Sequence, residues 1–130
     1  MIHQELTKRI LGACFEVANE LGPGFLESVY EKALLIALAG RGLEAEAQVP
    51  LEVRFRGQTV GAFVADILVE RKIIVEVKAV KALAPEHQAQ LINYLNATGL
   101  EVGLLVSFGG PRVEWKRCHR PDQGEGDGTT

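Results

Sequence analysis

Several features that define other protein classes are scarce or missing in this 130-residue chain. Its two cysteines, Cys14 and Cys118, form no CxxC pair and have no histidines at zinc-site spacing, so we expect two reduced thiols. No uninterrupted apolar run approaches the roughly 20 residues of a membrane span. No charged-then-apolar leader opens the sequence either. We therefore expect a soluble, cytoplasmic protein without a membrane partner.

An excess of either charge is also missing from most of the chain. There are 14 basic and 17 acidic residues, and three of the acids, Asp122, Glu125 and Asp127, lie in the glycine-rich segment 121–130. The residues before this segment are formally neutral. At 47% hydrophobic residues the chain is long enough for one domain and too short for two. We predict a single domain over residues 1–120 and a disordered tail over residues 121–130.

The apolar periodicity predicts three helices and five strands. The expected helices span residues 4–21, 26–39 and 85–98. The expected strands span residues 47–54, 59–69, 72–80, 103–108 and 112–118. The third helix joins two strands and is long enough to be a crossover connection. The order therefore predicts an α/β fold with a mixed central sheet flanked by helices.

Three charged residues stand on otherwise apolar strand-like runs in FVADILVERKIIVEVKAV, residues 63–80. If the turn between the two strands centres on Arg71, Asp66 lies opposite Glu76. Side chains alternate along a strand, so Glu76 and Lys78 share one face, which Asp66 joins. The apolar neighbours expected on that face are Val64, Leu68 and Ile74, with Ile67, Val69, Ile73, Val75 and Val77 opposite.

Buried charges are costly unless they are paired or bound to metal, so this cluster predicts a catalytic metal site. The carboxylates of Asp66 and Glu76 supply the oxygen ligands that suit Mg²⁺ or Mn²⁺. Lys78 could orient or deprotonate a water, or stabilise charge on a phosphate. The set suits metal-assisted phosphodiester hydrolysis. The alternative is a solvent-facing strand, or a salt bridge between Lys78 and a neighbouring acid.

Two helices offer further polar side chains. On the helix 85–98, Gln90 and Tyr94 are four residues apart and share a face, with His87 three residues before Gln90. This face could hold a nucleophilic water, although surface positions for His87 and Gln90 and a packing role for Tyr94 are the alternative.

Residues 22–34, GPGFLESVYEKAL, form a sharp turn followed by a helix on which Glu27, Tyr30 and Glu31 lie close together. Glu27 could be a third metal carboxylate. Alternatively, Glu27 favours the helix dipole and Tyr30 belongs to the core.

Gly24, Glu27 and Tyr30 reproduce the pattern that names the GxxExxY proteins. The chain also resembles that family through ADILVERKIIVEVKAV and LAPEHQAQLINYLNATG, and the resemblance covers roughly residues 7–115. The family is assigned to the PD-(D/E)XK nuclease superfamily, which implies a restriction-endonuclease-like αβββαβ core. The resemblance further implies that Asp66 and Glu76 are metal ligands and that Lys78 is catalytic.

A resemblance to the RecB-like branch of that superfamily adds two more positions. Its QxxxY motif matches Gln90 to Tyr94, which implies catalytic roles for both, and its early-helix glutamate corresponds to Glu27 as a metal ligand. One residue departs from the pattern, because Ala65 stands where the superfamily name has proline. That proline shapes the strand and binds nothing.

We therefore expect a Mg²⁺- or Mn²⁺-dependent nuclease, such as an endonuclease, that binds and hydrolyses DNA. The expected substrate contacts are His87, Tyr30, Lys81 and Arg71. Because the ordered chain is neutral, DNA binding should be weak and salt-sensitive unless a partner or a homodimer adds contacts. One alternative is a catalytically silent nucleic-acid-binding or regulatory module on the nuclease fold. Another is a hydrolase that acts on a nucleotide or small phosphate ester.

Overall fold

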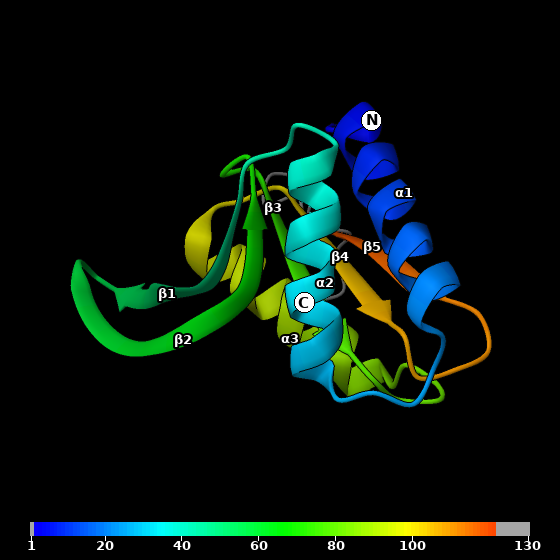
Figure 1. The fold of residues 1–130 in the computed structure, drawn as a ribbon. Coiled ribbons are helices and arrows are strands. Elements are labelled where there is room, and N and C mark those ends of the chain that lie inside the picture. The colour runs from blue at the N-terminus through cyan, green and yellow to red at the C-terminus, as the bar shows by residue number, and fades with distance from the viewer. Residues whose placement is uncertain (1, 122–130) are drawn as a thin grey trace.

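The computed structural model describes residues 2–121 and contains the eight expected elements in the expected order (Figure 1). The helices are α1 (Gln4–Leu21), α2 (Glu27–Gly40) and α3 (Pro85–Thr98). The strands are β1 (Ala45–Phe55), β2 (Gln58–Val69), β3 (Ile73–Lys78), β4 (Val102–Ser107) and β5 (Glu114–His119). Each boundary lies within two residues of its prediction. The tail predicted to be disordered lies outside the described residues, apart from Pro121.

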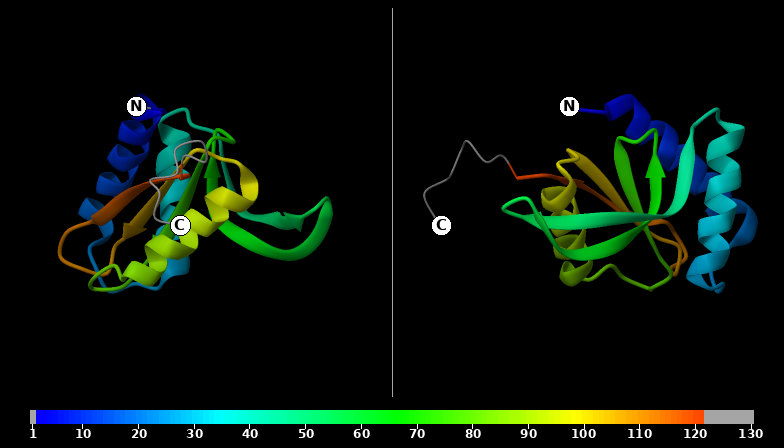
Figure 2. Two further views of the ribbon diagram at one scale, coloured as in Figure 1. Left: turned by 180° about the vertical axis from the view of Figure 1, so that it is seen from behind. Right: turned by 90° about the vertical axis from the view of Figure 1, so that its left-hand side faces the viewer.

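The five strands form one mixed sheet in the order β1-β2-β3-β4-β5. Strands β3 and β4 are parallel and joined by α3, whereas the other neighbours are antiparallel. Figure 2 shows α1 and α2 on one side of the sheet and α3 on the other. The predicted α/β fold with flanking helices is confirmed. Within residues 2–121, no helix has the length and apolar character needed to cross a membrane.

Alternation along the central strands divides the core into two layers. The side chains that pack beneath α1 and α2 include Ile67, Val69, Ile73, Val75 and Val77. Leu68 and Ile74 face α3 instead, as predicted. The prediction for Val64 is wrong, because its side chain is 48% exposed and belongs to neither layer. At that point β2 has already separated from β3.

Strands β1 and β2 extend well beyond the rest of the sheet. Their ladder continues to Phe55 and Gln58, whereas β2 pairs with β3 only over residues 67–69. The outer part, residues 49–65, projects from the body as a curved two-stranded ribbon, called the arm below (Figures 1 and 2). At its tip, Arg56 and Gly57 both have positive φ, which suits a two-residue hairpin turn.

Each core layer contains one cysteine. Cys14 lies beneath α1 and α2, Cys118 lies on the α3 side, and both thiols are buried and free. Burial raises the pKa of Cys14 to about 12. Burial also raises the pKa of Cys118, against a smaller lowering effect of Lys116.

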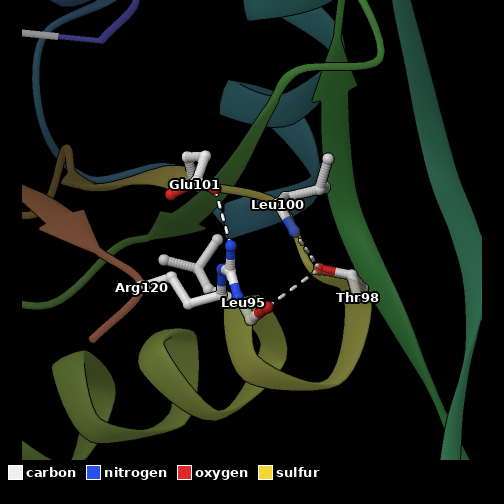
Figure 3. A network of polar contacts seen from close by, with 5 residues as sticks. All are labelled: Leu95, Thr98, Leu100, Glu101 and Arg120. Carbon is white, nitrogen blue, oxygen red and sulfur yellow. Dashed lines mark hydrogen bonds and ion pairs between the residues drawn. The ribbon is translucent and has the colours of Figure 1, made fainter. Parts of the chain in front are cut away.

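The last turn of α3 is fastened to the strands that follow it (Figure 3). The Thr98 hydroxyl accepts a hydrogen bond from the Leu100 N–H at 3.2 Å and lies 3.4 Å from the Leu95 carbonyl. Arg120 forms an ion pair with Glu101 at 2.6 Å, and its backbone N–H donates to the Glu101 carbonyl at 2.9 Å. These contacts fix the end of α3 relative to β4 and β5.

The segment after β3 is held against the segment after β4. The Ser107 hydroxyl donates to the Val80 carbonyl at 2.7 Å and accepts from the Val80 N–H at 3.1 Å. The Phe108 N–H donates to the Lys78 carbonyl at 2.9 Å. A Cβ atom on Gly109 would overlap the Val80 backbone, so only glycine permits this approach.

We predict that Gly109→Ala destabilises the fold by about 1–3 kcal/mol, because the Val80 backbone would have to move to admit the new methyl group. Gly40→Ala is the matched control, since a Cβ atom added there, at the end of α2, would meet nothing within 4 Å. Urea denaturation monitored by circular dichroism measures both variants. Equal midpoints for the two would contradict the predicted clash.

Candidate active site

Strands β2 and β3 part beyond the pair Ile67 and Val75, and two carboxylates fill the gap. The backbone N–H of Asp66 donates to Glu76 Oε2 at 2.9 Å. The backbone N–H of Val77 donates to Asp66 Oδ2 at 2.8 Å. Each carboxylate therefore takes the place of a backbone carbonyl and binds the opposite strand. The predicted opposition of the two acids is confirmed.

The turn that sets this register is centred on Arg71, as predicted. Glu70 and Arg71 both have positive φ, and the Lys72 N–H donates to the Val69 carbonyl at 2.9 Å. Glu70 also holds the turn in place, because its carboxylate accepts from the Glu44 N–H at 2.6 Å.

A break in the neighbouring ladder coincides with the point at which β2 leaves β3, at Asp66. Strand β1 pairs with β2 at Ala47 and again at Val49, but the residue between them, Gln48, has a φ of 54° and stands opposite Asp66 without pairing. Beyond this point β2 curves away from the sheet. Asp66 thus lies where a regular strand ends and the arm begins.

Burial governs the electrostatics of the pair. Glu76 is only 6% exposed, and burial raises its pKa to about 7. The hydrogen bond from Asp66 opposes this shift, whereas the Asp66 charge adds to it and the Lys78 charge lowers it. Burial also raises the pKa of Asp66, against the Val77 hydrogen bond and Lys78. Negative charge is costly here, which is the condition under which a cation is bound.

The exposed-strand and salt-bridge alternatives for this cluster are not supported. Glu76 is buried, and no ion pair joins Lys78 to a carboxylate within residues 2–121. Lys78 is half-buried at the end of β3 and pairs in register with Ser107 of β4. Ser107 was given no role from the sequence. A lone hydroxyl in the apolar run GLLVSF was the available signal.

Two acids of α2, Glu27 and Glu31, act on the pair through their charges. Glu27 is exposed, and its charge raises the pKa of both Asp66 and Glu31. The pKa of Glu31 is raised mainly by burial, and Glu31 accepts a hydrogen bond from Gln48 Nε2 at 2.5 Å. From the sequence, Glu31 was expected near Glu27 but was given no role. Its position one helical turn after Glu27 was the signal.

The donor set fits a hard cation in part. Among residues 2–121 no group of three His, Cys, Asp or Glu side chains is arranged to hold a metal, so Glu27 does not complete a cage with Asp66 and Glu76. The pair itself keeps one oxygen each, Oδ1 and Oε1, outside the described hydrogen bonds. Mg²⁺ typically takes one or two carboxylates and retains several waters, which such a pair satisfies.

Helix α3 brings Tyr94 to the site. Its ring stacks on Phe63 of the arm, with centroids 3.8 Å apart and planes inclined by 7°. Burial raises the pKa of Tyr94, and the charges of Glu76 and Asp66 raise it further. Gln90 is exposed one turn earlier on the helix. His87 has a structural task, because its Nδ1 accepts from the Ala84 N–H at 3.1 Å and caps α3.

Tyr30 lies in the core, and the predicted substrate contact is not supported. Its side chain is fully buried, and its ring stacks on Phe108 with centroids 4.7 Å apart. The hydroxyl donates to the Gly22 carbonyl at 2.6 Å and accepts from the Phe25 N–H at 3.2 Å. Tyr30 therefore closes the turn between α1 and α2, as the core alternative described.

The two predicted basic contacts lie in different places. Arg71 is on the far turn of the hairpin, pairs with Glu46 at 3.2 Å, and is five residues from Glu76, or about 16 Å along a strand. The structure therefore does not bring Arg71 to the carboxylates. Lys81 is exposed three residues after Lys78.

Comparisons with known proteins bear on the family and the fold of this chain. Residues 4–118 match the sequence model of the PD-(D/E)XK nuclease superfamily. The fold is similar to the crystal structure of SSO0001, with a TM-score of 0.58 and 21% sequence identity over 94% of this chain. This chain covers only 61% of that protein, and the likeness shows the fold alone. A search of curated proteins found no match.

We predict that Glu76→Gln stabilises the metal-free protein at pH 8. The folded-state pKa of about 7 lies above the ordinary value of 4.5, so this group's stabilising contribution is present below about pH 4.5 and is lost as pH rises through 7. Neutral glutamine avoids the loss, and the expected gain is about 1–3 kcal/mol at pH 8 and much smaller at pH 5.

Urea unfolding in EDTA at the two pH values measures this gain. Glu20→Gln, on the exposed face of α1, controls for the removal of one negative charge. If Glu76→Gln is less stable than the wild-type protein at both pH values, the Glu76 carboxylate stabilises the fold as a hydrogen-bond acceptor, and burial of its charge does not lower the stability.

Proposed function

This chain belongs to the PD-(D/E)XK nuclease superfamily, and we propose that it is a Mg²⁺- or Mn²⁺-dependent nuclease that hydrolyses DNA. The observation that carries the proposal is the buried pair Asp66 and Glu76, each held by the backbone of the other strand, with Lys78 at the strand end. Two finer assignments, to the GxxExxY family and to the RecB-like branch, stay predictions that rest on the motifs.

The ion would be held by Asp66 Oδ1 and Glu76 Oε1, the carboxylate oxygens that no described hydrogen bond uses. When bound, it would supply Lewis-acid polarisation of the phosphate and a more acidic water. Glu31 and Glu27 would extend the negative field from α2, because their charges already act on the pair. This arrangement needs no third direct carboxylate.

The proposed chemistry of the protein side chains follows from their places. The charge of Lys78 lowers the pKa of both carboxylates, and its strand is fixed by β4, so the ammonium can stabilise charge that develops on a phosphate oxygen. The Tyr94 hydroxyl and the exposed Gln90 amide are on the same face of α3 and can donate to other phosphate oxygens. We propose these five residues as the catalytic set: Asp66, Glu76, Lys78, Gln90 and Tyr94.

The neutral charge of the residues before the tail favours a second candidate function. Binding of duplex DNA draws much of its affinity from phosphate neutralisation, and this chain has no overall basic excess. The same catalytic set could therefore serve a nucleotide or another small phosphate ester. The alternative of a binding module without turnover has no comparable support, because this chain has a suitable residue at every expected catalytic position.

We predict that the protein cleaves DNA in Mg²⁺ or Mn²⁺ and that Lys78→Met lowers the rate by about 100-fold or more, because the charge beside the reacting phosphate is lost. Lys8→Met, on the exposed face of α1, is the matched control and should keep the wild-type rate. Plasmid, single-stranded DNA, RNA and nucleotides are compared in metal and in EDTA.

Circular dichroism separates loss of chemistry from loss of fold in this series. Cleavage of nucleotides but of no polymer would favour the second candidate function, hydrolysis of a nucleotide or another small phosphate ester. Equal rates for Lys78→Met and Lys8→Met would remove Lys78 from the catalytic set.

For Tyr94→Phe we predict a milder loss of about 2- to 13-fold in cleavage rate, as expected for one neutral hydrogen bond. The ring still stacks on Phe63, so unfolding stability should be unchanged. Tyr94→Leu removes the stack as well and should lower both quantities. A wild-type rate for Tyr94→Phe would show that the hydroxyl takes no part.

A further inference from the structure

One face of the arm carries an apolar strip from the carboxylate pair to the tip. Val49, Leu51, Val53 and Phe55 are alternate residues of β1, and Phe63 of β2 stands opposite Leu51. The pairing register shifts between Val53 and Arg54, just before the tip. Val49 and Leu51 pack on the core layer beside α3, Val53 is half-buried, and Phe55 is 60% exposed. The strip thus becomes more accessible with distance from the body. It is called the arm face below and comprises Leu51, Val53, Phe55 and Phe63.

The inner end of the arm face lies beside the proposed catalytic set. Phe63 is three residues before Asp66 on the same strand, and its ring stacks on Tyr94. The outer end is at the hairpin turn, where Phe55 pairs with Gln58. From Gln58 to Asp66 the strand is about 26 Å long, which corresponds to roughly eight stacked nucleotides.

The tip adds positive charge to an exposed ring. Residues 53–60, VRFRGQTV, contain two arginines and no acid. The Arg56 guanidinium lies 4.9 Å from the centroid of the Phe55 ring, and Arg56 joins no ion pair among the residues described. Arg54 is held by Glu52 at 2.9 Å. The guanidinium covers one face of the Phe55 ring, which leaves the other face for a base and places a positive charge, free of ion pairs, near that base's phosphate.

The partner that fits this surface is a single strand. Duplex DNA hides the faces of its bases and binds mainly through its phosphates, which a formally neutral chain attracts poorly. A single strand exposes its bases, and stacking on aromatic rings then supplies affinity without a large basic surface. We infer that the arm binds single-stranded DNA, with a base stacked on Phe55 and a phosphate near Arg56. This inference rests on the proposed nuclease function.

Binding of a labelled 12-nucleotide oligo-dT, measured by fluorescence anisotropy in EDTA, tests the inference without cleavage. Phe55→Ala should raise the dissociation constant by roughly 5- to 150-fold, the usual effect of losing one base–aromatic stack. Phe55→Tyr keeps the ring and should restore binding to within a few-fold. Phe15→Ala is the matched control, since Phe15 is 44% exposed on α1, across the sheet from the arm face.

The salt dependence of binding tests the phosphate contact separately. Arg56→Gln should reduce the slope of log affinity against log salt by about 0.7, the value for one phosphate on a single strand. Lys8→Gln removes an exposed charge from α1 and should leave the slope unchanged.

Three results would overturn the inference: no binding of oligo-dT by the wild-type protein, equal affinities for Phe55→Ala and Phe15→Ala, or tighter binding of a duplex or an RNA of the same length. None of these decides the nuclease function, which the cleavage assay with Lys78→Met tests independently. If the wild-type protein cleaves DNA and Phe55→Ala binds oligo-dT normally, the nuclease function stands and only the proposed role of the arm is excluded. Weakened binding in Phe55→Ala with rescue by Phe55→Tyr supports it.

Discussion

Burial of two carboxylates between diverging strands is the constraint on which the rest of this structure depends. A buried carboxylate needs donors, and Asp66 and Glu76 each take a backbone N–H that a regular ladder would have given to a carbonyl. The strands cannot pair normally where this happens, so β2 must leave β3. The site and the arm therefore have one cause, since the arm is the part of β2 that continues after the separation, with β1 beside it.

The rigid half of the site lies on the other side of the same gap. Lys78 ends a strand that is parallel to β4 and buried beneath helices on both faces of the sheet, and Ser107 and Phe108 hold the backbone that follows. A fixed backbone suits the role that we propose for Lys78, because no free energy is then needed to order this segment when a substrate binds. The arm, in contrast, has no second layer over most of its length. The fold thus separates the rigidly held end of β3, which we propose as the catalytic centre, from the projecting arm, which we propose as the binding surface.

The sequence was sufficient for the parts of this site that depend on regular geometry. A turn centred on Arg71 and alternation along two strands were enough to place Asp66 opposite Glu76. The same rule failed for Val64, because alternation assumes a continuous strand and Gln48 interrupts the neighbouring one with a left-handed residue. Nothing about Gln48 itself signals that break. The break is a property of the ladder between β1 and β2, so it becomes visible only once the positions of both strands are known.

The motif residues divide in the same way. Tyr30 and Glu27 are close in sequence, yet Tyr30 is used inside the turn between α1 and α2 whereas Glu27 acts on the site through its charge. A tyrosine at this position could pack in the core or contact a substrate. Which of the two it does depends on how close its hydroxyl comes to the turn between α1 and α2, and the spacing of residues in the sequence does not give that distance. Glu31 was overlooked because its partner, Gln48, is far along the chain. Arg71 lies five residues from Glu76 along the chain, so the structure does not bring it to the carboxylates, and its substrate contact stays a prediction.

The two buried thiols have a consequence for the chemistry of the intact protein. The thiolate is the reactive form of cysteine, and the raised pKa values of Cys14 and Cys118 keep that form scarce near neutral pH, while burial keeps reagents away. While folded, the native chain therefore behaves toward alkylating and oxidising agents as though it had no cysteine. A single cysteine placed on the exposed tip of the arm would be the one reactive thiol of the molecule, and a probe attached there would report on the arm alone.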